Sequence, residues 1–229
     1  MSIVSFVVKN KKRLIGRWAD FFFYVFQKPF YSISFNSDGN RFGCKGKMRN
    51  SHVLVLGHGN TISIGNNALL NKVDISISGH NNQLIIHDNV SFLEGGRIRI
   101  EDSNNIVEIL DRTTLINCFF SVADKNTKIN VGQDCLFSAG VIIRTSDSHS
   151  ILNLSGERIN PGRDVIIGNH VWIGYGTTVL KGSTIGDDSI VGTESVVSGQ
   201  QLEKNVVAVG NPCRIVKQGV NWTEKRLVT

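Results

Sequence analysis

The chain has 229 residues, of which 41% are hydrophobic, and it contains 23 glycines and 3 prolines. This composition is that of a folded, glycine-punctuated protein and excludes a disordered chain. Residues 1–50 hold ten Lys or Arg and two Asp, whereas the remaining 179 residues hold fifteen Lys or Arg against seventeen Asp or Glu. Because the positive charge lies in an N-terminal arm and not on the main body, we expect no nucleic acid partner.

The four cysteines are scattered and form no Cys-x-x-Cys pair: Cys44, Cys118, Cys135 and Cys213. This spacing favours reduced thiols in the cytoplasm over a disulfide framework or a zinc site. The chain starts with an apolar stretch followed by a basic cluster, which is the reverse of the order in a signal peptide. No apolar run reaches the length of a membrane-spanning helix. We therefore expect a cytoplasmic protein.

Residues 1–40 are predicted to form a basic, amphipathic, helical N-terminal segment. Apolar side chains between Leu14 and Phe26 recur at helical spacing, and Pro29 ends the pattern. Two interpretations remain open. The helix either caps the open end of the following domain and hides its edge strands, or it lies in a membrane interface and is attracted to anionic lipids. The second would hold the protein at the inner face of the cytoplasmic membrane.

From about residue 50, one phrase that begins with asparagine recurs along the chain. Asn60, Asn82, Asn105 and Asn126 lead its variants and lie 22, 23 and 21 residues apart. We interpret each phrase as one side of a coil that has three sides per turn. Asparagine suits the corners of such a coil because its side chain bonds to nearby backbone and because it tolerates the left-handed conformation.

Residues 145–163 interrupt this organisation with a polar stretch that contains Gly156 and the pair Pro161-Gly162. A long excursion from a rigid solenoid is usually functional or disordered. This one contains a histidine close to an aspartate, which favours function.

The tightest repeat follows the loop, where an aliphatic residue recurs at every sixth position: Ile167, Ile173, Val179, Ile185, Val191 and Val197. Neither an α-helix nor an ordinary strand generates this period, but a coil with flat sides of about six residues does. One aliphatic per side would enter a narrow core, and the glycine after four of them is expected to take a positive φ. The sequence therefore predicts an all-β parallel β-helix over residues 41–210, followed by a C-terminal tail at 211–229.

Three stretches resemble the hexapeptide-repeat acyltransferases: GERINPGRDVIIGNHVWIG at 156–174, VLKG at 179–182 and GNPCRIVK at 210–217. Within that superfamily the chain looks most like the bacterial capsule and polysaccharide O-acetyltransferases, the polysialic-acid O-acetyltransferases included. The match is specific over 140–217, loose over 50–140 and absent over 1–40. The resemblance implies a left-handed β-helix, a homotrimer with active sites between subunits, and acetyl-CoA as co-substrate with no tightly bound cofactor.

The family's catalytic histidine maps onto His149. A sugar hydroxyl is a poor nucleophile until its proton is removed, and a neutral imidazole does this well near neutral pH. Asp147 is expected to orient the ring and to stabilise the imidazolium, as the acid of a catalytic triad does. An isolated loop histidine is more often simply solvated, but the position of His149 in this long loop favours catalysis.

Trp172 lies in the motif that the family places beside the acetyl-transfer site. Its backbone N–H is the candidate oxyanion donor, and its indole is a candidate wall for the pantetheine or the sugar; the alternative is a large corner residue that stabilises the trimer interface. His170 would be a ligand in a hexapeptide metalloenzyme, but Tyr175 stands where a third histidine is required. We therefore expect no metal.

The resemblance also implies binding residues for both substrates. The positions that match CoA contacts are Gly174, Tyr175, Thr193 and Ser198, largely through backbone groups, with Arg214 and Lys217 near the phosphates. Cations suit these phosphates because they form charge-assisted hydrogen bonds with them. For the glycan acceptor the candidates are Asn117, Arg144 and Arg158. Lys181 is interpreted as a solvated corner residue.

The expected function is O-acetyl transfer from acetyl-CoA to a hydroxyl of a bacterial cell-surface polysaccharide, such as a capsule, O-antigen or exopolysaccharide. Transfer would be direct, with a histidine general base. Two alternatives remain open. The acceptor is a small molecule, such as a nucleotide-linked amino sugar, serine or an antibiotic, or else the protein is an inactive β-helix scaffold.

Overall fold

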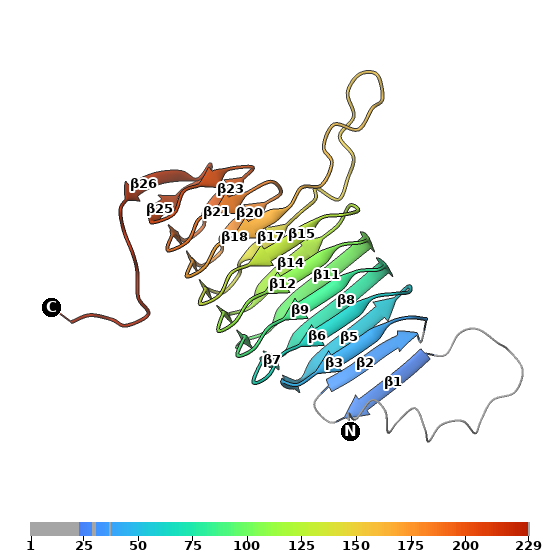
Figure 1. The fold of residues 1–229 in the computed structure, drawn as a ribbon. Coiled ribbons are helices and arrows are strands. Elements are labelled where there is room, and N and C mark those ends of the chain that lie inside the picture. The colour runs from blue at the N-terminus through green and yellow to red at the C-terminus, as the bar shows by residue number, and fades with distance from the viewer. Residues whose placement is uncertain (1–22, 29–30, 37, 229) are drawn as a thin grey trace, which may run out of the picture.

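The computed structural model describes residues 23–28, 31–36 and 38–228, which form a solenoid of short strands with no helix among them (Figure 1). Each turn of the chain contributes one strand to each of three sheets, which we call A, B and C in the order in which the chain meets them. Neighbouring strands of successive turns pair in parallel, so the predicted all-β parallel β-helix is confirmed. These described ranges hold no helix of the length and apolarity needed to cross a membrane.

The strands divide among the sheets as follows. Sheet A contains β1 (Phe23–Lys28), β2 (Tyr31–Asn36), β5 (Ser51–Leu56), β8 (Val73–His80), β11 (Gly96–Ser103), β14 (Cys118–Val122), β17 (Ile142–Arg144), β20 (Thr178–Leu180) and β23 (Val196–Ser198). Sheet B contains β3 (Arg41–Cys44), β6 (Thr61–Ile64), β9 (Gln83–Ile86), β12 (Ile106–Ile109), β15 (Lys128–Val131), β18 (Val165–Ile167), β21 (Thr184–Ile185) and β24 (Gln201–Leu202). Sheet C contains β4 (Lys47–Arg49), β7 (Leu69–Asn71), β10 (Ser91–Phe92), β13 (Thr114–Leu115), β16 (Leu136–Phe137), β19 (Trp172–Ile173), β22 (Ile190–Val191), β25 (Val206–Val209) and β26 (Arg214–Gln218).

The six-residue repeat places one aliphatic side chain per side in the core. Ile167 lies in sheet B, Ile173 in sheet C and Val179 in sheet A, and each is at most 1% exposed. The next three members of the repeat stack on them in register one turn later. Full burial of one such side chain stabilises a fold by about 1.5–3 kcal/mol. The repeat therefore determines both the core and the register of the last turns.

The glycines of the repeat serve a different purpose from the one we expected. None of Gly168, Gly174, Gly186 and Gly192 has a positive φ. A Cβ atom on Gly168 would lie 2.2 Å from Asp187 Oδ1, and one on Gly174 would lie 2.6 Å from Thr193 N. The prediction of positive φ was therefore wrong, and glycine is required because the next coil passes too close for a side chain. The left-handed residue comes two positions later, as at His170, where φ is 52°.

The recurring asparagines form a ladder inside the corner between sheets A and B. Asn60, Asn82 and Asn105 are at most 1% exposed. The side-chain oxygen of Asn60 accepts the N–H of Asn82 at 3.0 Å, and that of Asn82 accepts the N–H of Asn105 at 2.9 Å. The residue before the ladder position takes the left-handed conformation, as at Asn81 and Asn104. Both predicted properties of asparagine are therefore confirmed at these corners. One asparagine bonds to backbone through its side chain, and the asparagine before it takes the left-handed conformation.

The helical prediction for the N-terminal segment falls largely on residues 1–22, which lie outside the described residues. For Phe23–Lys28 and Tyr31–Asn36 it was wrong, because these residues form the antiparallel strands β1 and β2. The run Phe-Tyr-Val-Phe is rich in aromatic and β-branched residues, which favour strands. Pairing with β2 therefore outweighs the weak helical periodicity of this stretch.

The chain leaves the solenoid between β17 and β18, and residues 145–164 project from the A/B corner as a narrow finger (Figure 1). The finger is built from two antiparallel arms. Ile159 N–H donates to the carbonyl of Ile151 at 2.8 Å, and Asn153 N–H donates to that of Glu157 at 2.9 Å. This loop therefore has its own backbone hydrogen bonds and a defined shape.

Candidate active site

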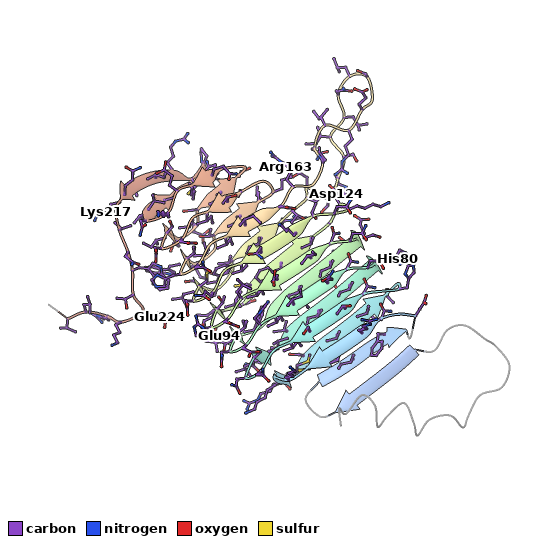
Figure 2. All side chains as sticks on the ribbon, viewed as in Figure 1. His80, Glu94, Asp124, Arg163, Lys217 and Glu224 are labelled. Carbon is purple, nitrogen blue, oxygen red and sulfur yellow. The ribbon has the colours of Figure 1, made fainter. Side chains whose placement is uncertain are left out.

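The predicted site residues lie at different corners of the coil. The A/B corner and its loop carry Asp147, His149 and Arg158, with Arg144 and Ser198 at the ends of nearby sheet A strands; the C/A corner carries Asn117, Gly174, Tyr175 and Thr193; and sheet C carries Trp172 on β19 with Arg214 and Lys217 on β26. Figure 2 shows Asp124 and Arg163 at the base of the projecting loop and Lys217 apart from them on β26.

His149 is exposed on the first arm of the loop, just beyond the solenoid. Its carbonyl oxygen accepts a hydrogen bond from the Asn160 side-chain amide at 2.9 Å, which ties the two arms together. Within the described residues nothing is hydrogen-bonded to the imidazole itself. The loop therefore presents a ring whose backbone is held and whose nitrogens are free to meet a substrate.

Among the described residues, no hydrogen bond or ion pair joins Asp147 to the His149 ring. Its Oδ2 accepts hydrogen bonds from Lys181 Nζ at 2.5 Å and from Asn160 Nδ2 at 2.7 Å. The Lys181 ammonium, with the Asn160 amide, lowers the pKa of Asp147, so that the carboxylate is the stable form. In the single chain Asp147 anchors the loop to the solenoid, and the triad arrangement that we predicted is not found there.

Ser148, directly before His149, is held in a left-handed conformation with φ of 65°. Its N–H donates to Ser146 Oγ at 3.1 Å, and its own Oγ accepts from Arg144 Nη2 at 2.7 Å. A non-glycine residue pays for positive φ with strain, and such strain persists only where the surroundings hold it. Arg144, predicted to bind the acceptor, thus fixes the turn that orients His149.

Arg158 also has an internal partner. Its two terminal nitrogens donate to the two carboxylate oxygens of Asp124 at 2.9 and 2.7 Å. Arg158, and secondarily the Ser146 hydroxyl, lower the pKa of Asp124. This bidentate pair ties the second arm of the loop to the A/B corner, so the predicted role of Arg158 in acceptor binding would have to compete with it.

The backbone of the Trp-Ile-Gly motif offers a different donor from the one we expected. Trp172 N–H donates to the carbonyl of Ser189 at 2.9 Å, as part of the ladder between successive coils. It is therefore not free to stabilise an oxyanion, and that prediction was wrong. In the part of the chain that the structure describes, Tyr175 N–H has no acceptor. The unpaired amide of the motif lies at the C/A corner, three residues beyond the tryptophan.

Asn117, Tyr175 and Thr193 lie at the C/A corner on different coils of the solenoid. The carbonyl of Asn117 accepts Gly140 N–H at 3.0 Å, and that of Tyr175 accepts Glu194 N–H at 2.8 Å. A hollow of about 340 Å³ lies beside Asn117 and is lined also by Arg97 and Phe119. The Arg97 guanidinium lies 5.8 Å from the centre of the Phe119 ring. This corner thus combines polar side chains, a cation and a free amide.

Comparison with known proteins identifies the family. Residues 164–199 match the family model described as bacterial transferase hexapeptide (six repeats). Over 176 residues the chain is 41% identical to the polysialic acid O-acetyltransferase of Neisseria meningitidis, a match that covers 76% of this chain and 80% of that protein. This chain belongs to the polysialic acid O-acetyltransferase family. It is accordingly an O-acetyltransferase.

Other members of the family agree in sequence and fold. A polysialic acid O-acetyltransferase of Escherichia coli O1:K1 / APEC is 40% identical over 115 residues, which are 50% of this chain and 37% of that protein. The solved structure of the polysialic acid O-acetyltransferase OatWY superposes with a TM-score of 0.73 at 34% identity, covering 82% of this chain and 90% of that one. The polySia-specific acetyltransferase NeuO gives 0.69 at 28% identity, covering 86% and 91%.

Two parts of this O-acetyltransferase site were missed by sequence reasoning. Lys181, interpreted as a solvated corner, is only 13% exposed and binds both Asp147 and the carbonyl of Asn160. Trp222, in the tail, stacks on His170 with ring centres 4.4 Å apart. Both contacts join residues far apart in the sequence, and no local motif marks them. His170 itself pairs with Asp188 at 2.8 Å.

Proposed function

We propose that this O-acetyltransferase transfers the acetyl group of acetyl-CoA to hydroxyls of an anionic cell-surface polysaccharide of the polysialic acid type, with His149 as general base. The observation that carries the proposal is an exposed imidazole on an anchored loop in a chain that is 41% identical to a polysialic acid O-acetyltransferase. Free nitrogens at a fixed position are what general-base catalysis requires.

The proposed reaction is a single displacement. His149 removes the proton of the sugar hydroxyl as the oxygen attacks the thioester carbonyl, and negative charge develops on the carbonyl oxygen. We assign donation to that oxyanion to the free N–H of Tyr175. Collapse of the intermediate breaks the carbon–sulfur bond, and the imidazolium returns the proton to the departing CoA thiolate. The products are an acetyl ester and free CoA.

This chemistry needs two copies of the chain. The A/B corner, which carries His149, and the C/A corner, which carries Tyr175, lie at opposite ends of the sheet A strands. A five-residue strand such as β14 is about 16 Å long, which is far beyond hydrogen-bond reach. We infer that the loop of one subunit meets the C/A corner of the next. Since a closed ring of such head-to-tail contacts is cyclic, the homotrimer implied by the family fits.

The loop itself supports association. Its aliphatic side chains are all more than half exposed in the single chain: Ile151, Leu152, Leu154 and Ile159. Contiguous exposed apolar side chains mark an interaction surface, and burying each against a neighbour contributes about 1.5–3 kcal/mol. A gel-filtration mass three times that of the chain, which falls when Leu152 and Leu154 are replaced by Ser, is the expected result.

The remaining binding residues are assigned by charge and position. Arg214 and Lys217 on the exposed strand β26 suit the phosphates of CoA. Asn117, with Arg97 beside it in the same hollow, suits a hydroxyl and a carboxylate of the glycan. We place the reaction in the cytoplasm, with the basic N-terminal segment holding the enzyme at the inner face of the membrane. Loss of anionic-vesicle binding on replacing Lys11, Lys12 and Arg13 by Gln would support that location.

The deciding experiment measures transfer of labelled acetyl from acetyl-CoA to polysialic acid, to other bacterial polysaccharides and to small acceptors. We expect an alkali-labile label on the anionic polymer that falls at least a hundredfold with His149→Ala. His58→Ala, at the same corner of an early coil, is the control and should keep full activity. Label on small acceptors alone would refute the polymer assignment, and an active His149→Ala variant would refute the base.

A further inference from the structure

The C-terminal tail is fixed along the B/C corner after it leaves β26. Val220 N–H donates to the carbonyl of Asn205 at 3.0 Å, and the Asn205 side-chain amide donates back to the carbonyl of Val220 at 3.0 Å. Two residues later, Trp222 reaches His170, which is 52 residues earlier in the chain. The tail therefore runs back over the last turns of the solenoid (Figure 1).

Trp222 makes three contacts there. Its indole N–H donates to the carbonyl of His170 at 2.7 Å, and its ring stacks on the His170 imidazole with an interplanar angle of 11°. Its other neighbour is the indole of Trp172, with ring centres 5.9 Å apart and planes tilted by 42°. A hydrogen bond and a stacked ring together leave the Trp222 side chain little rotational freedom.

The platform under Trp222 is itself fixed. His170 Nδ1 lies 2.8 Å from Asp188 Oδ1 on the next coil. Its backbone is left-handed, with φ of 52°, and its N–H donates to the carbonyl of Gln133 at 2.8 Å. Backbone and ring are thus held from both neighbouring coils, so that Trp222 rests on a rigid support.

Trp172, by contrast, makes no hydrogen bond through its indole within the described residues. It lies at the start of a two-residue strand, its side chain points outward from sheet C, and it is 39% exposed. Among the described residues, Trp222 is the one aromatic ring beside it. An exposed indole without such a neighbour samples several rotamers. The rigid side chain of Trp222 restricts which of them Trp172 adopts.

We propose that Trp222 is a positioning residue that fixes the indole of Trp172 against the acetyl-CoA of the active site. This inference rests on the proposed function, together with the expectation from the family resemblance that the Trp172 indole forms a wall for the pantetheine of acetyl-CoA. Trp222 acts through Trp172 and need not touch the substrate. The tail would then contribute to donor binding as well as to the stability of the last turns.

Three variants separate positioning from simple attachment of the tail. Trp222→Ala removes the stack and the contact with Trp172, whereas Trp222→Phe keeps a smaller aromatic ring and loses the N–H donor. Asn205→Gly is the matched control, because it removes the side-chain hydrogen bond to the Val220 carbonyl and so loosens the tail without touching Trp222, while glycine accepts the left-handed φ of 59° at that position. Each is tested in the full chain for steady-state kinetics and acetyl-CoA affinity by calorimetry.

We expect Trp222→Ala to raise the KM and the Kd for acetyl-CoA about tenfold, the upper range of an aromatic pair, with the acceptor KM unchanged. Trp222→Phe should stay within about threefold of the unaltered protein, and Asn205→Gly within about twofold. The exciton couplet of the two indoles in circular dichroism should disappear in Trp222→Ala and in Trp222→Phe and persist in Asn205→Gly.

Two results would overturn the inference. One is an unchanged acetyl-CoA KM and Kd in Trp222→Ala after the couplet has gone; the other is an equal loss in Asn205→Gly. Failure of the proposed function is distinguishable, because the unaltered protein would then transfer no acetyl group to polysialic acid. In that event the acetyl-CoA affinities still decide the inference, and absence of acetyl-CoA binding by the unaltered protein refutes both.

Discussion

Replacing Lys181 with Met tests whether the loop that carries His149 is held by the contact with Asp147. Met keeps the apolar stem of lysine and removes the ammonium. The Lys181 side chain is 13% exposed and that of Asp147 is 38% exposed. A hydrogen bond to a charged group contributes about 1.5–3 kcal/mol, and solvent screening at the partly exposed carboxylate reduces this to about 1–2 kcal/mol.

If this free energy holds the loop in its productive conformation, kcat/KM for acetyl transfer should fall about 5- to 30-fold in Lys181→Met, because each 1.36 kcal/mol is a factor of ten. The measurement is initial rates with polysialic acid as acceptor. Lys204→Met, which removes an exposed lysine from a later corner, is the control. In a double-mutant cycle with Asp147→Asn, the second substitution should lower kcat/KM much less than the first.

The effect also has a predicted pH dependence. The pKa of Asp147 lies below its ordinary value of 3.8, first because of Lys181. A carboxylate with a lowered folded-state pKa contributes stability that is present above its unfolded pKa and is lost as pH falls through the folded value. The deficit of Lys181→Met should therefore stay constant from pH 5 to 8. A rate within twofold of the unaltered protein, an additive cycle, or a deficit that changes near neutral pH would refute the reasoning.

Three further predictions concern the solenoid that supports the site. Asn82→Ala should lower the free energy of unfolding by about 2–5 kcal/mol, because two backbone groups lose their partner. Asn81→Gly, the control, should change it by less than about 0.5 kcal/mol. Equal losses in the two variants would contradict the role of the asparagine ladder. Arg158→Met should destabilise the protein at pH 7, because Arg158 lowers the pKa of Asp124. The difference in the free energy of unfolding should shrink below about pH 4, where Asp124 is protonated. A difference that persists in acid would be inconsistent with the Arg158–Asp124 pair. Gly174→Ala should cost about 1–3 kcal/mol in urea unfolding, because its Cβ would meet the next coil at 2.6 Å, and an unchanged midpoint would rule out the close approach.

The regular part of the fold could be predicted because its cause is local and repeated. Ile167, Ile173 and Val179 fill the core at fixed spacing, so the period reports the geometry directly. Asn82 was identified as a corner residue for a similar reason, since its type and spacing both fit. The role of glycine was misjudged at Gly174 because a close approach between coils and a positive φ select the same residue.

The site could be predicted less completely because its contacts join distant positions. His149 was found by resemblance, but Lys181 reaches Asp147 across 34 residues and no motif links them. Trp222 lies 52 residues from its hydrogen-bond partner. The donor role given to Trp172 N–H failed because the sequence does not reveal which amide of a corner the ladder leaves unpaired.

The solenoid ends in a way that limits its own growth. At the start of sheet A, β1 runs antiparallel to β2, and at the end of sheet C, β26 runs antiparallel to β25. A further coil from another molecule would have to continue both sheets with parallel strands in register, and the reversed strands present the wrong hydrogen-bonding pattern at opposite ends of the stack. One sheet at each end of the solenoid is therefore closed to a further parallel strand, which disfavours stacking of one solenoid on the next.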